Sequence, residues 1–208
     1  MDTRPVAEGL RARKTRRTRE RIAQAALDLF ARQGYRRTTI AQIAEAAEVS
    51  PRTVSGYFPA KEELIFHLQE EWFADLERRL AERDVREPTL EVVRAWIEAR
   101  MPEWYELAEE RRLRRRIVAS DEALLAHAAR FLDRAHDVLA AAIARDLGRE
   151  PDHIEPQMAA AATVAVFKAL EIGDEAEPGV GLGAWRERVR RLVDQAVRFV
   201  GAGIESLR

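Results

Sequence analysis

The chain has 208 residues, of which 34% are charged, no cysteine, and a formal net charge of −1. That length can bury a real core in one large or two small domains, and the lack of cysteine excludes disulfides, a thiol nucleophile and cysteine-ligated metals. The polar, basic N-terminus carries no apolar stretch, and no apolar run approaches the ~20 residues that span a bilayer, so a cytoplasmic protein without membrane contact is expected.

The charge is unevenly distributed along the chain. Residues 1–58 hold 12 Lys or Arg against 6 Asp or Glu, whereas the remainder holds 23 against 30. A basic N-terminal quarter on an acidic body indicates a polyanionic partner for that quarter, although a solvated basic tail would give the same counts.

Apolar residues recur at helical rather than alternating spacing, which predicts an all-α fold. Met101-Pro102 is expected to break one helix, and residues 174–183 are expected to form a loop. Capping residues, glycines and prolines predict nine helices near residues 15–33, 39–46, 51–57, 59–84, 88–100, 103–118, 120–147, 151–172 (or 156–172) and 185–200.

Two short helices behind a longer one, joined by a tight turn, are typical of helix-turn-helix geometry. Ser50 is expected to cap the third helix and Pro51 to occupy its first position. Val54 and Phe58 would face inward. The outward face would be small or hydrogen-bonding, as a helix in the major groove requires: Pro51, Arg52, Thr53, Ser55, Gly56 and Tyr57.

Phosphate contacts are expected around this face. Thr38 or Thr39 begins the second helix, where backbone N–H groups favour phosphate. Lys61 lies one turn into the fourth helix, and the N-terminal arginines would supply long-range attraction. The candidate DNA-binding residues are Thr38, Thr39, Ser50, Pro51, Arg52, Thr53, Ser55, Gly56, Tyr57 and Lys61.

Residues 18–64, TRERIAQAALDLFARQGYRRTTIAQIAEAAEVSPRTVSGYFPAKEEL, closely resemble the DNA-binding domain of the TetR (tetracycline repressor) family of transcriptional regulators. The matching residues are Ile22, Ala25, Ala26, Leu29, Phe30, Gly34, Tyr35, Thr38, Thr39, Ile43, Ala44, Val49, Ser50, Thr53, Tyr57, Phe58 and Lys61. At Arg52 and Ser55 the chain departs from residues common in the family, and Ser55 with Gly56 leaves a smaller recognition face.

The resemblance implies a homodimeric repressor that leaves a palindromic double-stranded operator when a small molecule binds the C-terminal domain. It also implies backbone contacts from Thr38 or Thr39, Tyr57 and Lys61, and base or phosphate contacts from Arg52, Thr53 and Ser55. The expected division is a disordered basic arm at 1–14, a helix-turn-helix domain at 15–58 and a ligand-binding and dimerisation domain at 59–208. Ligand binding would tilt the helix at 60–83 and change the separation of the two recognition helices.

Aromatic and methionine residues between 88 and 172 are candidates for a ligand pocket, although each is more often plain core: Trp96, Met101, Trp104, Tyr105, Leu125, Phe131, Val138, Met158 and Phe167. Small and branched residues on the last two long helices are candidates for a dimer interface built as a four-helix bundle, although some must pack within one subunit: Ala161, Ala162, Ala165, Val189, Leu192, Val193, Ala196 and Val200.

An enzyme is not expected. The four histidines are scattered, and neither paired Glu-x-x-His motifs nor a phosphate loop, nucleophile elbow or zinc motif occurs. No cofactor or metal is therefore predicted. A constitutive DNA-binding or packaging protein remains an alternative, because it would explain the charge asymmetry, but it would not explain a separate helical body rich in aromatics.

Overall fold

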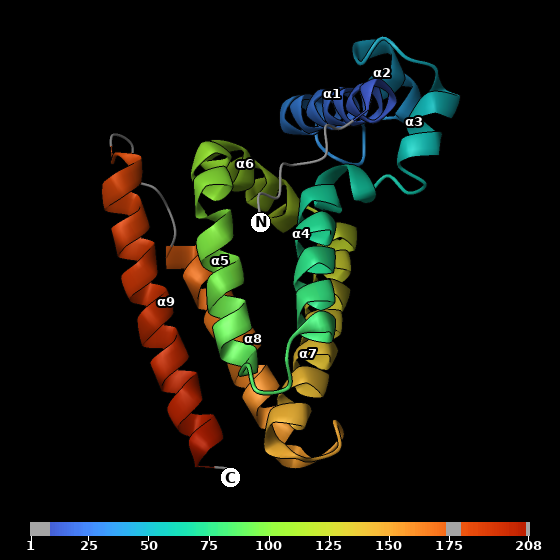
Figure 1. The fold of residues 1–208 in the computed structure, drawn as a ribbon. Helices are drawn as coiled ribbons and strands as arrows, with labels where there is room; N and C mark the ends of the chain where they lie inside the picture. Colours follow the sequence, from blue (N-terminus) through green and yellow to red (C-terminus); the bar gives the residue numbers. More distant parts are fainter. Residues whose placement is uncertain (1–8, 174–179, 207–208) are drawn as a thin grey trace. The chain divides into compact units, whose positions relative to one another are not determined.

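The computed structural model describes residues 9–173 and 180–206. These residues form nine α-helices and no strand, which confirms the all-α expectation (Figure 1). The helices are α1 (Leu10–Gln33), α2 (Ile40–Ala46), α3 (Pro51–Tyr57), α4 (Glu63–Glu82), α5 (Thr89–Glu106), α6 (Ala108–Ala119), α7 (Glu122–Leu147), α8 (Ile154–Gly173) and α9 (Leu182–Glu205). None of these described helices is long and apolar enough to cross a membrane.

The first helix begins five residues earlier than its expected start. The stretch LRARK at 10–14 consists of residues with good helix propensity, so the helix extends back to Leu10. The rest of the expected basic arm, residues 1–8, lies outside the described residues, as does part of the expected loop at 174–179. At the other end, α9 is longer than predicted in both directions.

The expected helix break at Met101-Pro102 is wrong. α5 contains Pro102 and continues to Glu106. Pro102 has no N–H to donate to the carbonyl of Glu98, which costs the helix one hydrogen bond. Packing on either side holds the helix together, because Met101 is buried and the Tyr105 ring contacts Trp185 of α9.

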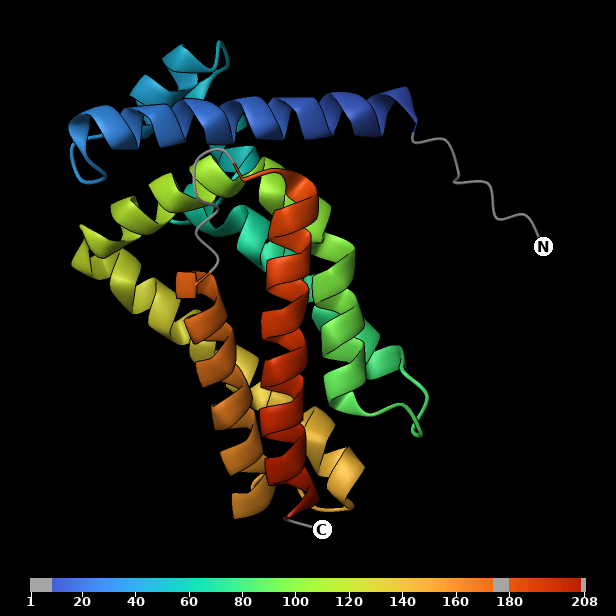
Figure 2. The same cartoon turned by 90° about the vertical axis from the view of Figure 1, so that its left-hand side faces the viewer.

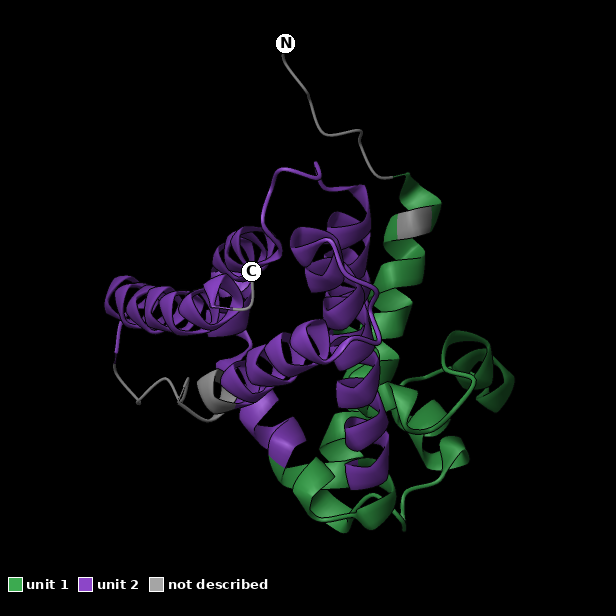
Figure 3. Ribbon diagram, turned by 90° about the horizontal axis from the view of Figure 1, so that it is seen from below, with its two compact units in different colours: residues 1–68, 116–124 green, residues 69–115, 125–208 purple. Residues whose placement is uncertain are grey.

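The chain divides into two compact units (Figure 3). Unit 1 consists of residues up to 68 together with residues 116–124, and unit 2 consists of residues 69–115 and those from 125 onward. A single domain boundary is expected from the sequence after residue 58. In the structure, unit 1 instead combines two segments that are far apart in the sequence. Its second segment is the end of α6 and the start of α7.

Unit 1 has a core of residues at helical spacing on α1 and at the joints of the short helices. Phe30 and Tyr35 are in ring contact at 5.1 Å, and Phe58 meets His67 edge-on at 5.6 Å. Its other fully buried apolar residues include Ile22, Ala26, Leu27, Ile43, Ala47, Val54 and Leu64. This core fixes the orientation of α2 and α3 against α1.

In unit 2, α9 packs along both α5 and α8 (Figure 2). Val189, Val193 and Val200 face inward from α9. α4 is joined to α7 by Arg83, whose side chain is 2% exposed and lies 2.5 Å from Asp146. Unit 2 is thus a helical bundle in which α9 packs on α5 and α8, and a buried ion pair joins α4 to α7.

Candidate functional site

The short helices α2 and α3 are each capped at their N-terminus, and one strained residue lies in the turn between them. Thr39 and Gln42 form a reciprocal capping box, with hydrogen bonds of 3.2 and 2.9 Å. Glu48 has φ of 52°, in the left-handed region that glycine usually fills. Ser50 then accepts a 3.0 Å hydrogen bond from the Thr53 backbone N–H, and Pro51 occupies the first turn of α3, both as predicted from the sequence.

The exposed face of α3 has the composition expected of a recognition helix. Arg52, Ser55 and Gly56 are exposed, whereas Val54 is fully buried beneath them. A Cβ built on Gly56 would meet nothing within 4 Å, so glycine is not needed there for packing inside the protein. Its absence of a side chain leaves room for close approach by another molecule.

The sequence pointed to either Thr38 or Thr39, and the structure separates them. Thr38 is buried, and its hydroxyl donates to the Gly34 carbonyl at 2.9 Å and accepts from Gln33 at 3.1 Å. Thr38 therefore closes the turn after α1. Thr39 is exposed at the start of α2, so it is the one of the two threonines whose side chain is accessible to another molecule.

Lys61 was expected to reach a DNA backbone, but the structure gives it internal partners. Its Nζ donates to the Tyr35 carbonyl at 2.6 Å and lies 4.2 Å from the centre of the Tyr35 ring. Burial lowers the pKa of Lys61 below the usual lysine value, opposed by the nearby carboxylates of Glu62 and Asp121. The ammonium group thus ties the chain just before α4 to the turn after α1.

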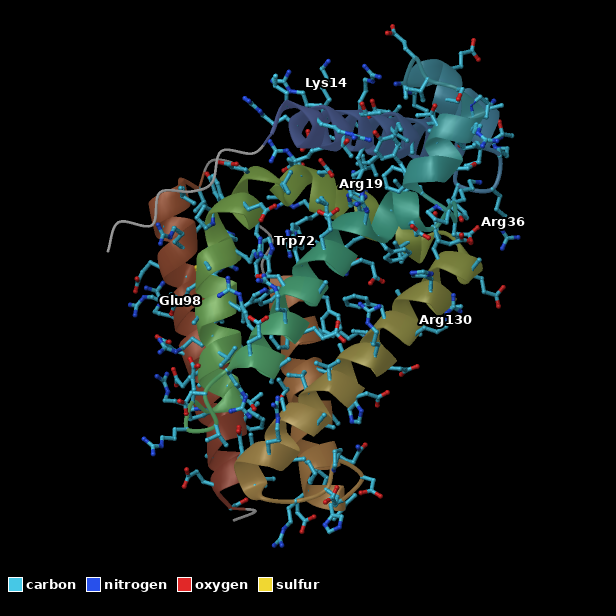
Figure 4. All side chains as sticks on the ribbon, turned by 45° about the vertical axis from the view of Figure 1, so that its right-hand side comes forward. Lys14, Arg19, Arg36, Trp72, Glu98 and Arg130 are labelled. Atoms are coloured by element: carbon cyan, nitrogen blue, oxygen red, sulfur yellow. The ribbon has the colours of Figure 1, made fainter. Side chains whose placement is uncertain are left out.

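A hollow of about 340 Å³ lies between the start of α1 and α3, and the sequence did not single out most of its lining. The lining repeats at helical spacing and combines cations with hydroxyls: Leu10, Arg11, Lys14, Thr15, Thr18 and Tyr57. Figure 4 shows Lys14 on this part of α1. The spacing of three to four residues between these side chains could have revealed the hollow from the sequence. The expectation that residues 1–14 form a disordered arm prevented this, because it left residues 10–14 out of the first helix.

The second segment of unit 1 makes a charged contact with the turn after α1. Arg36, which is labelled in Figure 4, has its Nε 2.7 Å from Asp121 Oδ2, and the Asp121 side chain is 5% exposed. Asp121 Oδ1 also accepts a 2.9 Å hydrogen bond from the Ala123 backbone N–H at the start of α7. The hydrogen bond from Arg36 lowers the pKa of Asp121 below its usual range.

The proposed ligand-pocket residues fall into separate places. Trp96 and Trp104 are in ring contact at 5.6 Å, whereas Phe131 pairs with Phe73 at 5.2 Å. Met101 is buried, Tyr105 and Val138 are half-buried, and Leu125 and Met158 are exposed.

Phe167 lines a cavity of only about 20 Å³, room for one water, between α5, α8 and α9. Its other lining residues are apolar apart from one threonine: Leu90, Val93, Ile97, Thr163, Val166, Val193, Ala196, Val197 and Val200.

The residues proposed for a dimer interface also differ in how deeply they are buried. Val189, Val193 and Val200 are buried inside unit 2 against neighbouring helices, so they are not available to a partner subunit. Ala162, Leu192 and Ala196 are half-buried, and Ala161 and Ala165 are exposed on α8.

Over the residues that the structure describes, no group of three or more His, Asp or Glu side chains could hold a metal ion.

Comparison with known proteins covers both parts of the chain. The profile of bacterial regulatory proteins of the tetR family matches residues 22–68, and that of the MftR C-terminal domain matches residues 87–203. The HTH-type transcriptional regulator TcmR of Streptomyces glaucescens is 49% identical over 81 residues, which span 37% of this chain and 36% of TcmR.

Two solved structures resemble nearly the whole chain. The SmeT–triclosan complex has a TM-score of 0.62 at 25% identity, covering 88% of this chain and 90% of SmeT. Native NalD of Pseudomonas aeruginosa, the secondary repressor of the MexAB-OprM multidrug efflux pump, has a TM-score of 0.61 at 21% identity, covering 89% and 96%. The matched tetR profile describes regulatory proteins, and TcmR is a transcriptional regulator, in agreement with the expectation from the sequence that the chain is not an enzyme.

Proposed function

Because the chain belongs to the TetR family of DNA-binding transcriptional regulators, we propose that it is a homodimeric repressor that a small molecule releases from a palindromic operator. The small-molecule part of the proposal is supported by SmeT, a relative of similar fold that was solved with triclosan bound.

DNA would be held by two surfaces of unit 1. Arg52, Thr53 and Ser55 would enter the major groove from α3, with Gly56 allowing close approach. Arg11, Lys14 and Tyr57 would line the hollow beside them, where a phosphate would meet two cations and hydroxyl donors. This arrangement supports separate roles for the two surfaces, the first in reading sequence and the second in holding the backbone.

One observation carries the proposed response to an effector: residues 116–124 belong to unit 1. The helices α6 and α7, which contain this segment, lie mainly in unit 2. A shift of α6 would therefore displace Asp121, and through its 2.7 Å contact with Arg36 it would pull on the turn that precedes α2. This route adds to the tilt of α4 expected from the sequence.

The proposed dimer surface lies on α8 and α9. Ile154, Met158, Ala161 and Ala165 are exposed at the i, i+4, i+7, i+11 spacing of one helix stripe. Phe199 of the neighbouring helix α9 is 72% exposed. An exposed apolar stripe of this kind supports pairing with the same stripe of a second copy, which forms a closed, two-fold dimer.

The test is selection of bound DNA from a random pool by the full-length protein at a stated salt concentration. Enrichment of a palindrome with half-sites about one helical turn apart is the expected result. Binding that is sensitive to salt but enriches no sequence would overturn the repressor proposal and favour a packaging protein.

A further inference from the structure

Three of the four tryptophans carry buried indole N–H groups that have no acceptor among the described residues: Trp96, Trp104 and Trp185. Buried indole N–H groups ordinarily find a hydrogen-bond partner, and leaving one unpaired costs on the order of 1 kcal/mol or more. All three residues belong to unit 2. Trp96 and Trp104 are both on α5 and their rings are in contact, so these two unpaired donors lie close together and require a physical explanation.

These donors sit within a cluster of flat rings. The Trp104 ring centre lies 5.6 Å from that of Trp96 and 5.9 Å from that of Trp72 on α4. Trp185 on α9 instead contacts the Tyr105 ring, at 5.4 Å. A molecule entering here would meet aromatic faces for stacking and indole donors at their edges.

The charges nearby disfavour a cationic guest. The Arg111 guanidinium lies 5.1 Å from the Trp104 ring centre. Asp75, the carboxylate on the adjoining stretch of α4, is already bound by Arg100 at 2.6 Å and by Arg79 at 3.0 Å. A neutral or anionic molecule fits this surface better than a cation.

Pro102 supplies a point at which the cluster can open. It lies between Trp96 and Trp104 on α5, and it removes the hydrogen bond that would join the last turn to the Glu98 carbonyl. Movement of the turn that carries Trp104 and Tyr105 would separate Trp104 from Trp96 at a smaller cost than in an uninterrupted helix.

We propose that this tryptophan cluster (Trp72, Trp96 and Trp104) binds the effector, and that the effector is a flat, conjugated molecule with hydrogen-bond acceptor oxygens and no positive charge. This inference rests on the proposed function and specifies the effector's chemistry. The acceptor oxygens would pair with the indole N–H groups, and the flat rings would stack between the indoles.

Three sulfonates with the same anionic group test the proposal: anthraquinone-2-sulfonate, anthracene-2-sulfonate and octane-1-sulfonate. Calorimetry gives their affinities for the full-length protein, and release of the selected operator gives the response. The quinone is expected to bind about tenfold more tightly than anthracene, which lacks its two ring oxygens, and to release the operator. Octane-1-sulfonate is expected to bind most weakly.

Tryptophan-to-phenylalanine variants keep a ring and remove the donor. Trp96→Phe and Trp104→Phe are each expected to reduce the preference for the quinone over anthracene about fivefold, the worth of one neutral hydrogen bond. Trp185→Phe removes a buried, unpaired N–H of the same kind from a ring that contacts Tyr105 instead of the cluster, so it should leave this preference unchanged. Thermal melting and operator affinity without ligand establish that each variant is folded.

Equal affinity for the two ring systems, a preference that survives both substitutions, or no binding of any sulfonate would overturn the proposed ligand class. Release by octane-1-sulfonate alone would also overturn it but would leave the effector-controlled repressor intact. The operator-binding part of the proposed function is tested separately by the DNA selection, which uses no ligand.

Discussion

Arg36 and Asp121 are 85 positions apart in the sequence, yet their side chains meet at 2.7 Å within one compact unit. Arg36 lies in the turn just before α2, and Asp121 lies between α6 and α7. The aspartate also caps α7 through the Ala123 backbone N–H, so a shift at the start of α7 is passed directly to the arginine.

Arg36→Gln should uncouple effector binding from operator release. We expect operator affinity without effector to change little, while the effector concentration needed for release rises about fivefold or more, the low end of typical coupling energies. Fluorescence anisotropy of labelled operator during an effector titration measures both quantities. Arg37→Gln is the control, because Arg37 donates instead to the Gln33 carbonyl. An identical shift in both variants would rule out a specific role for the pair.

Arg52 and Lys14 should affect DNA binding in different ways. Arg52→Ala is expected to relax sequence preference at one operator position, at a cost of about 1–3 kcal/mol against the best site. Lys14→Ala is expected to weaken binding to all sequences equally and to lower the slope of log K against log salt by about 1. Affinities for selected and random DNA at several salt concentrations separate the two effects. Equal losses on both DNAs for Arg52→Ala would refute the base-reading role.

Lys61→Met should destabilise unit 1 rather than remove a phosphate contact. Methionine keeps the aliphatic stem but loses the hydrogen bond to the Tyr35 carbonyl and the cation over the Tyr35 ring, together worth about 1–2 kcal/mol. We expect a lower melting temperature and an unchanged salt slope in DNA binding. A lower salt slope at unchanged stability would instead return Lys61 to the DNA backbone, as the sequence alone suggested.

Met158→Glu should convert the dimer to monomers. A charge in the middle of the exposed α8 stripe would be buried without a partner at the proposed interface. Analytical ultracentrifugation measures the change, and Leu125→Glu on α7, also exposed, serves as the matched control. If both variants remain dimeric, the interface lies elsewhere.

Asp75 should make the stability of unit 2 depend on pH. Desolvation opposes the charged form, but hydrogen bonds from Arg100 and Arg79 prevail and lower the pKa of Asp75 below its usual value. A depressed carboxyl pKa stabilises the folded state above the unfolded-state pKa of about 4, and this contribution is lost as the pH falls through the lower, folded-state pKa.

Asp75→Asn is therefore expected to cost about 2 kcal/mol at pH 7 and progressively less below pH 4. Urea unfolding followed by tryptophan emission reports on unit 2, because all four tryptophans lie there. Asp137→Asn, at a side chain 80% exposed, should cost little at any pH. A loss for Asp75→Asn that does not vary with pH would mean that packing, not charge, is responsible.

Local signals predicted the helix-turn-helix well. Ser50 and Pro51 define the start of α3 through interactions within a few residues, and Gly34 ends α1 for the same reason. The helix break predicted at Pro102 was wrong, because packing of the surrounding residues of α5 outweighs the local cost of the proline. The intrinsic penalty of proline is visible in the sequence, but the tertiary contacts that offset it are not.

Long-range partners could not be predicted. The sequence gives no reason to pair Arg36 with Asp121 or to place the Lys61 ammonium on Tyr35, since these contacts depend on how distant helices meet. Helical periodicity placed Val189 and Val193 on one apolar face of α9. It could not show whether that face packs inside one subunit or against a second subunit. The unpaired indole N–H groups are likewise a property of the folded environment alone.

The two-segment construction of unit 1 has a consequence for building chimaeras. A hybrid made by joining residues up to 68 to the body of a relative would bring Arg36 without its own Asp121, because residues 116–124 would come from the other parent. Operator choice would transfer with the first segment, while the response to a signal would depend on whether the relative supplies a carboxylate at the matching position. Under the proposed function, specificity and inducibility would therefore be inherited through different stretches of the sequence.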